Sequence, residues 1–329
     1  MEQADDDHYA WIVKKLSGGR IVPFLGAGAN LCDRGDDSWA PGLPFLPSGS
    51  ELARHLAEEG LYPKPGDPDL LRVSQYVDKA GGEDELYRYL HEVFGPDYPP
   101  TSLHRLLARV ARYLAESELR QLLAVTTNYD DLLEKALTDE GLEFDVVWYE
   151  AKQNSAERRK FLHRPPGGQP VVVEVGNEYK GLPIELERPV VLKLHGCLIR
   201  GSAGDDAGDD SYVITEDSYI DYLAGGDVRS QIPIALLNRM SGSSFLFLGY
   251  SLSDWNMRVI LNRIWGTSKL GTRSWAIQRE PTDPALAKIE RTLWDKRKNM
   301  DVELVFCELS EYVRQLNRRL AVAAPATSD

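Results

Sequence analysis

Polar residues that could act on a nucleotide stand directly after two apolar runs of the sequence. Asn128 and Asp130 follow the run at 121–126, and His195 follows the run at 190–194. An asparagine amide can orient a water or a ribose hydroxyl, a histidine can accept a proton or a hydrogen bond, and a carboxylate can stabilise developing positive charge. Simpler interpretations stay open, because Asn128 or Asp130 would also cap the next helix and a lone histidine often bonds nearby backbone.

A glycine turn, Gly26-Ala27-Gly28, ends another apolar run and leads to Asn30. Glycine lets the backbone turn sharply and lets a phosphate approach backbone amides without an intervening Cβ. The full dinucleotide fingerprint needs a third glycine where this chain has Leu31, and it needs a later carboxylate at a strand end, which is missing. The turn alone is therefore equally consistent with a nucleotide loop and a plain tight turn, and it argues against hydride transfer.

A fourth polar cluster contains Gly249, Ser251 and Asp254, just before a predicted helix at 255–265. Ser251 and Asp254 are candidates to hold a ribose or a phosphate, and capping of that helix is the alternative. No metal site is predicted, because no second histidine or cysteine stands at ligand spacing from His195 and the three cysteines form no Cys-x-x-Cys pair.

The elements that must position these clusters are predicted to be buried strands separated by helices. Their apolar runs occupy residues 21–25, 121–126, 190–194 and 244–248. This alternation predicts an α/β, Rossmann-like fold with a mainly parallel sheet and helices on both faces. Ligands bind outside the carboxyl ends of the strands in such sheets, so the four clusters are expected to meet at one crevice. Pro23 is expected to interrupt strand pairing locally.

The chain is predicted to form one domain over residues 1–320 with two insertions. Three helical stripes predict a helical insertion subdomain at about 61–118, and residues 150–188 read as a second insertion around a short strand at 171–175. Residues 321–329 are expected to be a disordered tail or a linker.

Composition limits the classes of partner. A net charge of −13 over 329 residues argues against direct nucleic-acid binding and against an anionic membrane surface. No apolar run is long enough to span a membrane, and the acidic N-terminus does not read as a secretory signal. Few and scattered cysteines suit a reducing compartment, so a cytoplasmic protein is expected.

The ordered set of motifs resembles the sirtuin superfamily. The segments that carry the resemblance are Gly26-Ala27-Gly28-Ala29, Thr126-Thr127-Asn128-Tyr129-Asp130, Leu194-His195-Gly196, and Gly249-Tyr250-Ser251 with Asp254. Protein deacetylases of that superfamily carry four zinc cysteines and a Pro-Asp-Phe-Arg segment. This chain has neither, and its nearest segment is Pro44-Phe45-Leu46-Pro47. The resemblance is therefore to the bacterial sirtuin-like NAD hydrolases of antiphage defence.

That resemblance implies an NAD+ hydrolase that releases nicotinamide and ADP-ribose and depletes NAD during abortive infection. NAD is then a substrate, and no metal is required. The implied catalytic residues are Asn128, His195 and Asp130. The residues implied to hold NAD are Gly26, Ala27, Gly28, Asn30, Thr127, Gly249, Ser251 and Asp254.

The resemblance also implies a homo-oligomer that is controlled by a sensor or activator protein or by a fused C-terminal domain. Two other functions are consistent with the same residues. One is a non-catalytic module that senses NAD or ADP-ribose, and the other is a zinc-free NAD-dependent protein deacylase.

Overall fold

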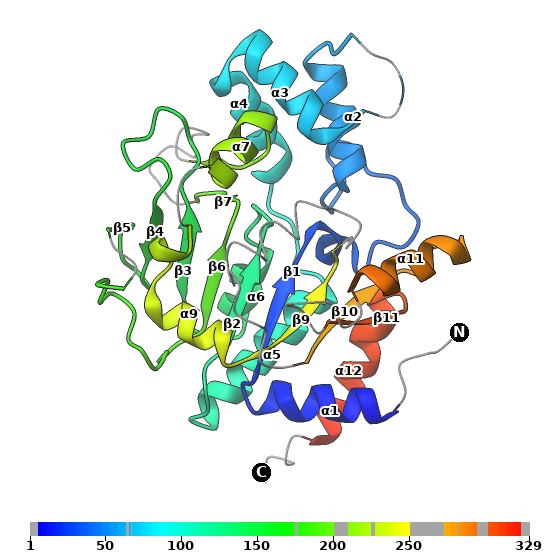
Figure 1. Cartoon of the computed structure of the whole chain (residues 1–329), viewed down its shortest axis with the longest axis vertical. Coiled ribbons are helices and arrows are strands. Elements are labelled where there is room, and N and C mark those ends of the chain that lie inside the picture. The colour runs from blue at the N-terminus through cyan, green and yellow to red at the C-terminus, as the bar shows by residue number, and fades with distance from the viewer. Residues whose placement is uncertain are drawn as a thin grey trace.

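A twisted, mainly parallel sheet forms the centre of the protein (Figure 1). The structure is a computed structural model that describes residues 6–63, 66, 68–174, 177–200, 210–224, 228–250, 273–281, 283–294 and 302–323. Within these residues the sheet has the strand order β11-β10-β9-β1-β2-β6-β3-β4-β5. Its strands are β1 Ile21–Leu25, β2 Leu123–Thr126, β3 Asp145–Tyr149, β4 Phe161–Arg164, β5 Val171–Val173, β6 Val190–Lys193, β9 Ser244–Leu248, β10 Ser274–Gln278 and β11 Val302–Phe306.

All neighbouring strands from β11 to β3 pair in parallel, and only β4 and β5 add antiparallel pairs at one edge. The predicted Rossmann-like α/β class is therefore confirmed. Strands β2 to β6 lie on one side of β1 in the sheet, and strands β9 to β11 lie on the other side. This change of direction is a topological switch point, where open α/β sheets place their ligands.

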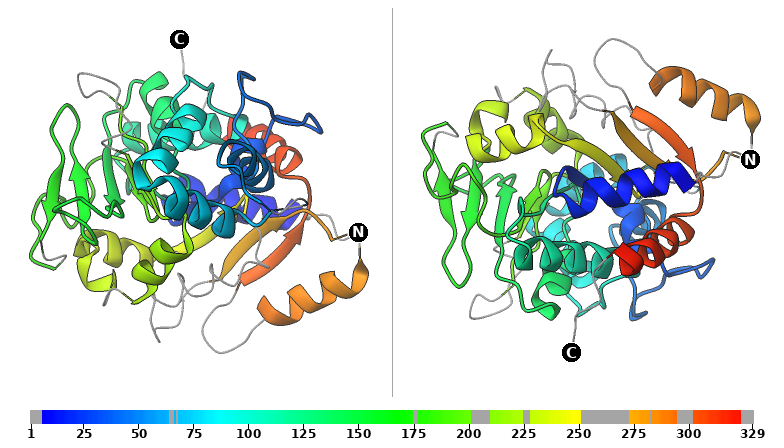
Figure 2. Two further views of the ribbon diagram at one scale, coloured as in Figure 1. Left: turned by 90° about the horizontal axis from the view of Figure 1, so that it is seen from above. Right: turned by 90° about the horizontal axis from the view of Figure 1, so that it is seen from below.

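Helices cover both faces of the sheet (Figure 2). On one face α1, α5, α6 and α12 share a core with the sheet, and on the other face α7, α9 and α11 do so. Consecutive residues of β2 point to opposite faces. Ala124 lies in the core shared with α1, α5, α6 and α12, and Leu123 and Val125 lie in the core shared with α7, α9 and α11. The bounds are α1 Asp6–Ser17, α5 Ser102–Glu116, α6 Leu132–Asp139, α7 Glu216–Ala224, α8 Val228–Gln231, α9 Ile234–Ser241, α11 Pro284–Trp294 and α12 Leu309–Ala323.

A separate helical layer stands beyond one end of the sheet and contains α2 (Gly49–Glu59), α3 (Leu70–Gly81) and α4 (Glu83–Phe94) (Figure 1). These three amphipathic helices bury their apolar faces in a further core, which also contains Leu132, Leu198, Tyr212 and Ile214. The helical layer thus has different bounds from the insertion expected at 61–118. Helix α2 joins it, and α5 packs on the sheet instead.

Three local predictions have specific outcomes. Pro23 pairs in register with Leu246 of β9, whereas β2 pairs only with Phe24 and Leu25, so the pairing is shortened on the β2 side alone. The short strand expected at 171–175 is β5, which pairs with β4, a strand that the sequence did not suggest. Helix α12 continues through Ala323, into the predicted tail, and the helix expected at 255–265 lies outside the described residues.

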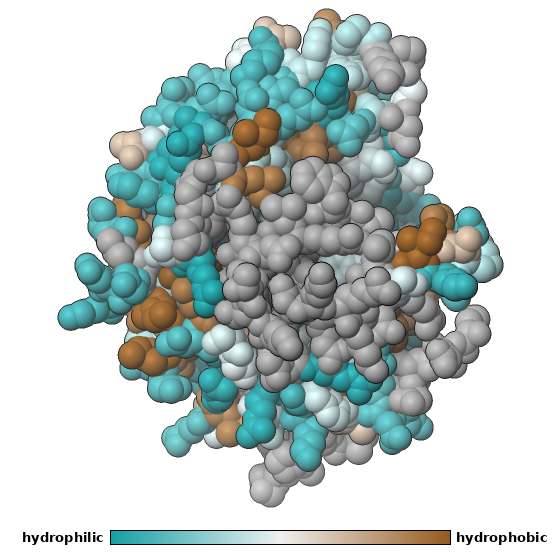
Figure 3. Space-filling model, in the orientation of Figure 1, coloured by the Kyte–Doolittle hydropathy of each residue, from teal (hydrophilic) through white to brown (hydrophobic). Residues whose placement is uncertain are grey.

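The surface of the described residues is mainly hydrophilic on the face shown in Figure 3, where apolar side chains form small separate groups. No helix in the described part of the chain is long and apolar enough to cross a membrane.

Helix α5 begins with a buried cap that gives a pH-dependent prediction. Thr101 caps the helix, and Nδ1 of His104 accepts from the Thr101 amide at 3.2 Å and lies 2.8 Å from Thr101 Oγ1. Burial lowers the pKa of His104 to about 4, so the folded protein holds this ring neutral. The unfolded chain binds a proton at about pH 6.5, so the stability from this site is lost as the pH falls from 6.5 toward 4.

His104→Gln keeps a residue that suits the capping box and removes the titration. We expect wild type to lose about 3 kcal/mol of unfolding free energy relative to this variant between pH 7 and pH 4. Urea unfolding of both proteins across that range measures the difference. Other titrating groups, such as Glu150 with its pKa raised to about 7 by burial, are common to both proteins and cancel. Parallel pH profiles would contradict the prediction.

Candidate functional site

One cleft of about 1070 Å³ lies at the carboxyl ends of the adjacent strands β9, β1, β2 and β6. These are the four strands whose ends carry the polar clusters, and residues of all four clusters line the cleft, whereas Gly26 is not among the lining residues. The predicted site residues that line the cleft are Ala27, Gly28, Asn30, Thr127, Asn128, Asp130, His195 and Gly249. Ser251 and Asp254 lie outside the described residues.

The glycine turn packs against the end of β9. The Gly28 amide donates to the Gly249 carbonyl at 2.8 Å, and the Gly26 amide donates to Leu248 O at 3.0 Å. A Cβ on Gly28 would lie 2.8 Å from Gly249 O, and one on Gly26 would lie 2.8 Å from the Tyr250 ring. Close packing within the protein therefore requires glycine at these two positions. Their amides already donate to backbone carbonyls and are not available to a phosphate, whereas the sequence suggested that the glycines let a phosphate approach them.

A hydrogen-bonded chain links four of the predicted site residues. Asn30 Nδ2 donates to Asp130 Oδ2 at 2.6 Å, and Asn128 Nδ2 donates to Asn30 Oδ1 at 3.4 Å and to Gly26 O at 3.1 Å. Asp130 Oδ1 also accepts from the Leu132 amide at the start of α6 at 3.2 Å, so the capping interpretation holds for Asp130 as well. The contacts of Asn128 fix its Nδ2 group and leave its Oδ1 without a partner among the described residues.

His195 stands beside this chain on the cleft wall and is 4% exposed. Its Nδ1 lies 3.3 Å from the Tyr219 hydroxyl, and its Nε2 has no hydrogen-bond partner among the described residues. Burial lowers the pKa of His195 to about 3, so the ring is neutral at physiological pH. A neutral ring with such low basicity is better suited to hydrogen bonding than to accepting a proton.

The structure adds cleft residues that the sequence did not identify as functional. Tyr219 contacts His195, and the Tyr250 hydroxyl hydrogen-bonds the Thr127 hydroxyl, which joins the ends of β9 and β2. Cys32, which the sequence gave no reason to include, also lines the cleft, and burial raises the pKa of its thiol to about 11. The pattern of strands and glycines carries no signal for these side chains, since their positions depend on tertiary packing.

The long segment between β1 and α2 forms another part of the cleft wall. Gly35, Asp36, Pro47 and Ser48 from this segment line the cleft. A buried ion pair organises it, in which both Arg34 Nη atoms contact the Glu51 carboxylate, and the Trp39 and Ser48 amides donate to the same carboxylate. The Arg34 guanidinium holds the pKa of Glu51 well below its usual range. The segment is therefore held by specific contacts, although beyond the short 3-10 helix Ala27–Leu31 it has no regular structure.

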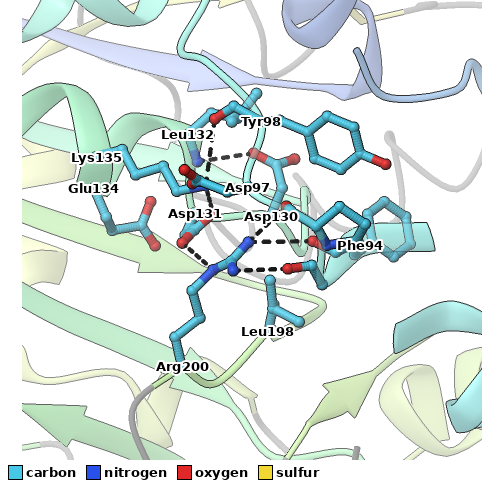
Figure 4. Close-up of polar contacts among 12 residues, drawn as sticks. Phe94, Asp97, Tyr98, Asp130, Asp131, Leu132, Glu134, Lys135, Leu198 and Arg200 are labelled. Carbon is cyan, nitrogen blue, oxygen red and sulfur yellow. Dashed lines mark hydrogen bonds and ion pairs between the residues drawn. The ribbon is translucent and has the colours of Figure 1, made fainter. Parts of the chain in front are cut away.

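Arg200 links the helical layer to the loop that carries Asn128 and Asp130 (Figure 4). Its Nε lies 2.6 Å from Asp131 Oδ2, and its other nitrogens donate to Gly95 O at 2.7 Å and Pro96 O at 2.9 Å, just after α4. Lys135 strengthens the same link, because its Nζ lies 3.2 Å from Asp131 Oδ1 and 2.7 Å from Asp97 Oδ1. The loop between β2 and α6 is thus fixed to the end of α4.

A Rossmann-like α/β protein is the class that this sheet and cleft define. A family profile described as a SIR2-like domain matches residues 122–302, which is more than half of the chain, and the chain belongs to this family. Within the described residues, no group of three or more His, Cys, Asp or Glu side chains is placed to hold a metal ion.

Known relatives come from bacteria. NAD(+) hydrolase ThsA of Acinetobacter baumannii (strain 532279) is 29% identical over 256 residues, which cover 77% of this chain and 41% of that protein. Defense-associated sirtuin 2 of Bacillus subtilis is 23% identical over 297 residues, 88% of this chain and 24% of that protein. NAD(+) hydrolase ThsA of Bacillus cereus (strain MSX-D12) is 27% identical over 245 residues, which cover 73% of this chain and 39% of that protein. The chain therefore spans well under half the length of these relatives.

Proposed function

We propose that this protein is an NAD+ hydrolase that cleaves the bond between nicotinamide and ribose and depletes NAD during antiphage defence. Its place in the SIR2-like family and its similarity to proteins named NAD(+) hydrolase and defense-associated sirtuin support this proposal. The contacts of Asn128 in the cleft give this proposal its main structural support. The Nδ2 group of Asn128 donates to Gly26 O and Asn30 Oδ1, and its Oδ1 has no hydrogen-bond partner among the described residues, so this oxygen can accept from a water or a ribose hydroxyl.

The proposed reaction needs no group beyond NAD+ and water. The bond from the nicotinamide nitrogen to ribose C1′ breaks through an oxocarbenium-like state, and a water adds to C1′. The water loses one proton, so the products are nicotinamide, ADP-ribose and a proton. Asn128 Oδ1 accepts a hydrogen bond from this water or from a ribose hydroxyl, and the Asp130 carboxylate favours the positive charge that develops on the ribose.

His195 takes the role of orienting the ribose in this proposal. A ring with a pKa of about 3 is a weak base, so proton removal by His195 is less favourable than a hydrogen bond from or to its Nε2. The Tyr219 hydroxyl at Nδ1 fixes the orientation of the ring. The released proton then passes to solvent.

Nicotinamide release tests the proposal. The purified protein is incubated with NAD+, and nicotinamide and ADP-ribose are separated by chromatography, over a range of protein concentrations because the resemblance implies a controlled oligomer. Asn128→Ala and His195→Ala serve as inactive variants. Equal formation of both products supports the hydrolase.

Parallel measurements distinguish the other two functions. Calorimetric binding of NAD+ without product at any protein concentration would indicate the sensing module. Turnover that appears only when an acyl-lysine peptide is added would indicate the deacylase. Full activity of both variants would show that the assigned residues are not the catalytic ones.

A further inference from the structure

A fully buried lysine lies directly beneath the loop that holds Asn128 and Asp130. Lys193 is the last residue of β6, stands two positions before His195 and is 0% exposed. Its Nζ donates to the backbone carbonyl of Asp130 at 2.6 Å and to Glu134 Oε1 on α6 at 2.6 Å. The lysine therefore contacts the backbone of the loop itself.

The charge of this lysine is retained despite its burial. Burial alone would lower the pKa of Lys193, but the neighbouring Cys197, Glu134 and Asp130 raise it above the ordinary value. Removing two charges from water is costly, and well-packed apolar side chains often replace a buried ion pair without loss of stability. Global stability is thus a weak explanation for a lysine in the otherwise apolar segment Val190–Leu194.

The position of the Asp130 carbonyl gives a better explanation. The Asp130 side chain is fixed by Asn30 and by the Leu132 amide, and Lys193 fixes the peptide group on the other side. Asn128 is two residues earlier in the same loop, and its Nδ2 group is bonded to Asn30. A rotation of the Asp130 peptide can therefore disturb, through the Asp130 side chain and Asn30, the hydrogen bonds that hold Asn128.

We propose that Lys193 is a positioning residue for the active loop, and that its bond to the Asp130 carbonyl sets the geometry of Asn128 and Asp130 for NAD+ cleavage. This inference rests on the proposed function and extends it to a residue outside the cleft. Small displacements of a reacting group can reduce a rate by about 100-fold. The lysine acts through the loop and does not touch the substrate.

Two variants separate this role from that of a simple ion pair. Glu134→Gln keeps Lys193 and its bond to Asp130, so kcat is expected to stay within about threefold of wild type. The double variant Lys193→Met with Glu134→Leu removes both charges together and keeps an apolar core of similar volume. We expect it to fold and to lose about 30- to 100-fold in kcat, with a smaller change in KM.

A matched control weakens the polar contacts of a buried carboxylate elsewhere. Asp145→Asn weakens the contacts of Asp145 with His163 and Arg188 at the start of β3, the opposite end of its strand from the cleft, and is expected to lower stability without lowering kcat. A folded double variant with kcat within twofold of wild type would overturn the proposal.

Hydrogen exchange of the peptide that covers residues 127–133 gives a readout that does not depend on NAD+ cleavage. We expect faster exchange there in the double variant than in Glu134→Gln, and unchanged exchange would overturn the positioning role. If wild type releases no nicotinamide, the proposed function fails, and the exchange measurement still decides whether Lys193 orders the loop.

Discussion

Replacing Asn128 by alanine is expected to lower the rate of nicotinamide release by at least about 100-fold, because loss of one preorganised polar group at a reacting centre has costs of that size. The side chain is 9% exposed and is held by Gly26 O and Asn30 Oδ1, so its amide oxygen is fixed in position before NAD+ binds. The measurement is kcat/KM for NAD+ under conditions in which wild type releases nicotinamide.

A surface asparagine provides the matched control for this substitution. Asn317 on α12 is half-buried outside the cleft and accepts a hydrogen bond from Arg109 at 2.5 Å, so Asn317→Ala is expected to leave the rate unchanged. Thermal unfolding of both variants shows whether each is folded. A folded Asn128→Ala protein that keeps more than a tenth of wild-type activity would remove Asn128 from the catalytic assignment.

The substitution Gly249→Ala is expected to reduce the free energy of unfolding by more than about 2 kcal/mol, because it combines backbone strain with a clash. Gly249 has φ +72°, and an added Cβ would lie 2.1 Å from the Ala29 nitrogen and 2.5 Å from the Gly28 carbonyl carbon. Both neighbours are backbone atoms in or directly after the glycine turn, so they can move away only by opening the contact between this turn and the end of β9. NAD+ hydrolysis is expected to fall with stability.

The substitution Gly141→Ala is a control that distinguishes the cost of backbone strain from the cost of a steric clash. Gly141 has φ +70° after α6, and an added Cβ would meet nothing within 4 Å. Gly141→Ala therefore carries the strain alone and is expected to cost about 1 kcal/mol. Urea unfolding of the two variants gives the comparison, and equal losses would show that the contact between Gly249 and the turn contributes nothing.

The sheet could be predicted from the sequence because its central strands are mostly apolar on both faces and are followed closely by glycine or polar residues. The runs that became β1, β2, β6 and β9 are continuous and buried, which is typical of parallel strands between two helical layers. The antiparallel edge of the sheet was harder to predict from the sequence, because β4 alternates buried and half-buried residues within an irregular segment. The layer of α2, α3 and α4 could be recognised as helical, but its neighbours depend on contacts that periodicity does not encode.

Much of the site could be located from the sequence, since parallel topology brings the strand ends together at a switch point. The roles of individual residues could not be derived in this way. Asn30 connects Asp130 to Asn128 through side-chain hydrogen bonds that only the folded chain creates. Lys193 did carry a signal, because a lysine within a buried strand requires a partner, although the sequence does not identify Glu134 or the Asp130 carbonyl as that partner.

The contact between Gly28 and Gly249 also bears on the order in which the protein is made and folds. Gly28 leaves the ribosome early, but the carbonyl that binds its amide belongs to a residue far along the chain. Contacts between such distant positions form late, because a long loop must close first. The cleft is therefore incomplete until β9 has been synthesised and has paired with β1. A growing chain with this fold cannot assemble its cleft before most of the sheet is present.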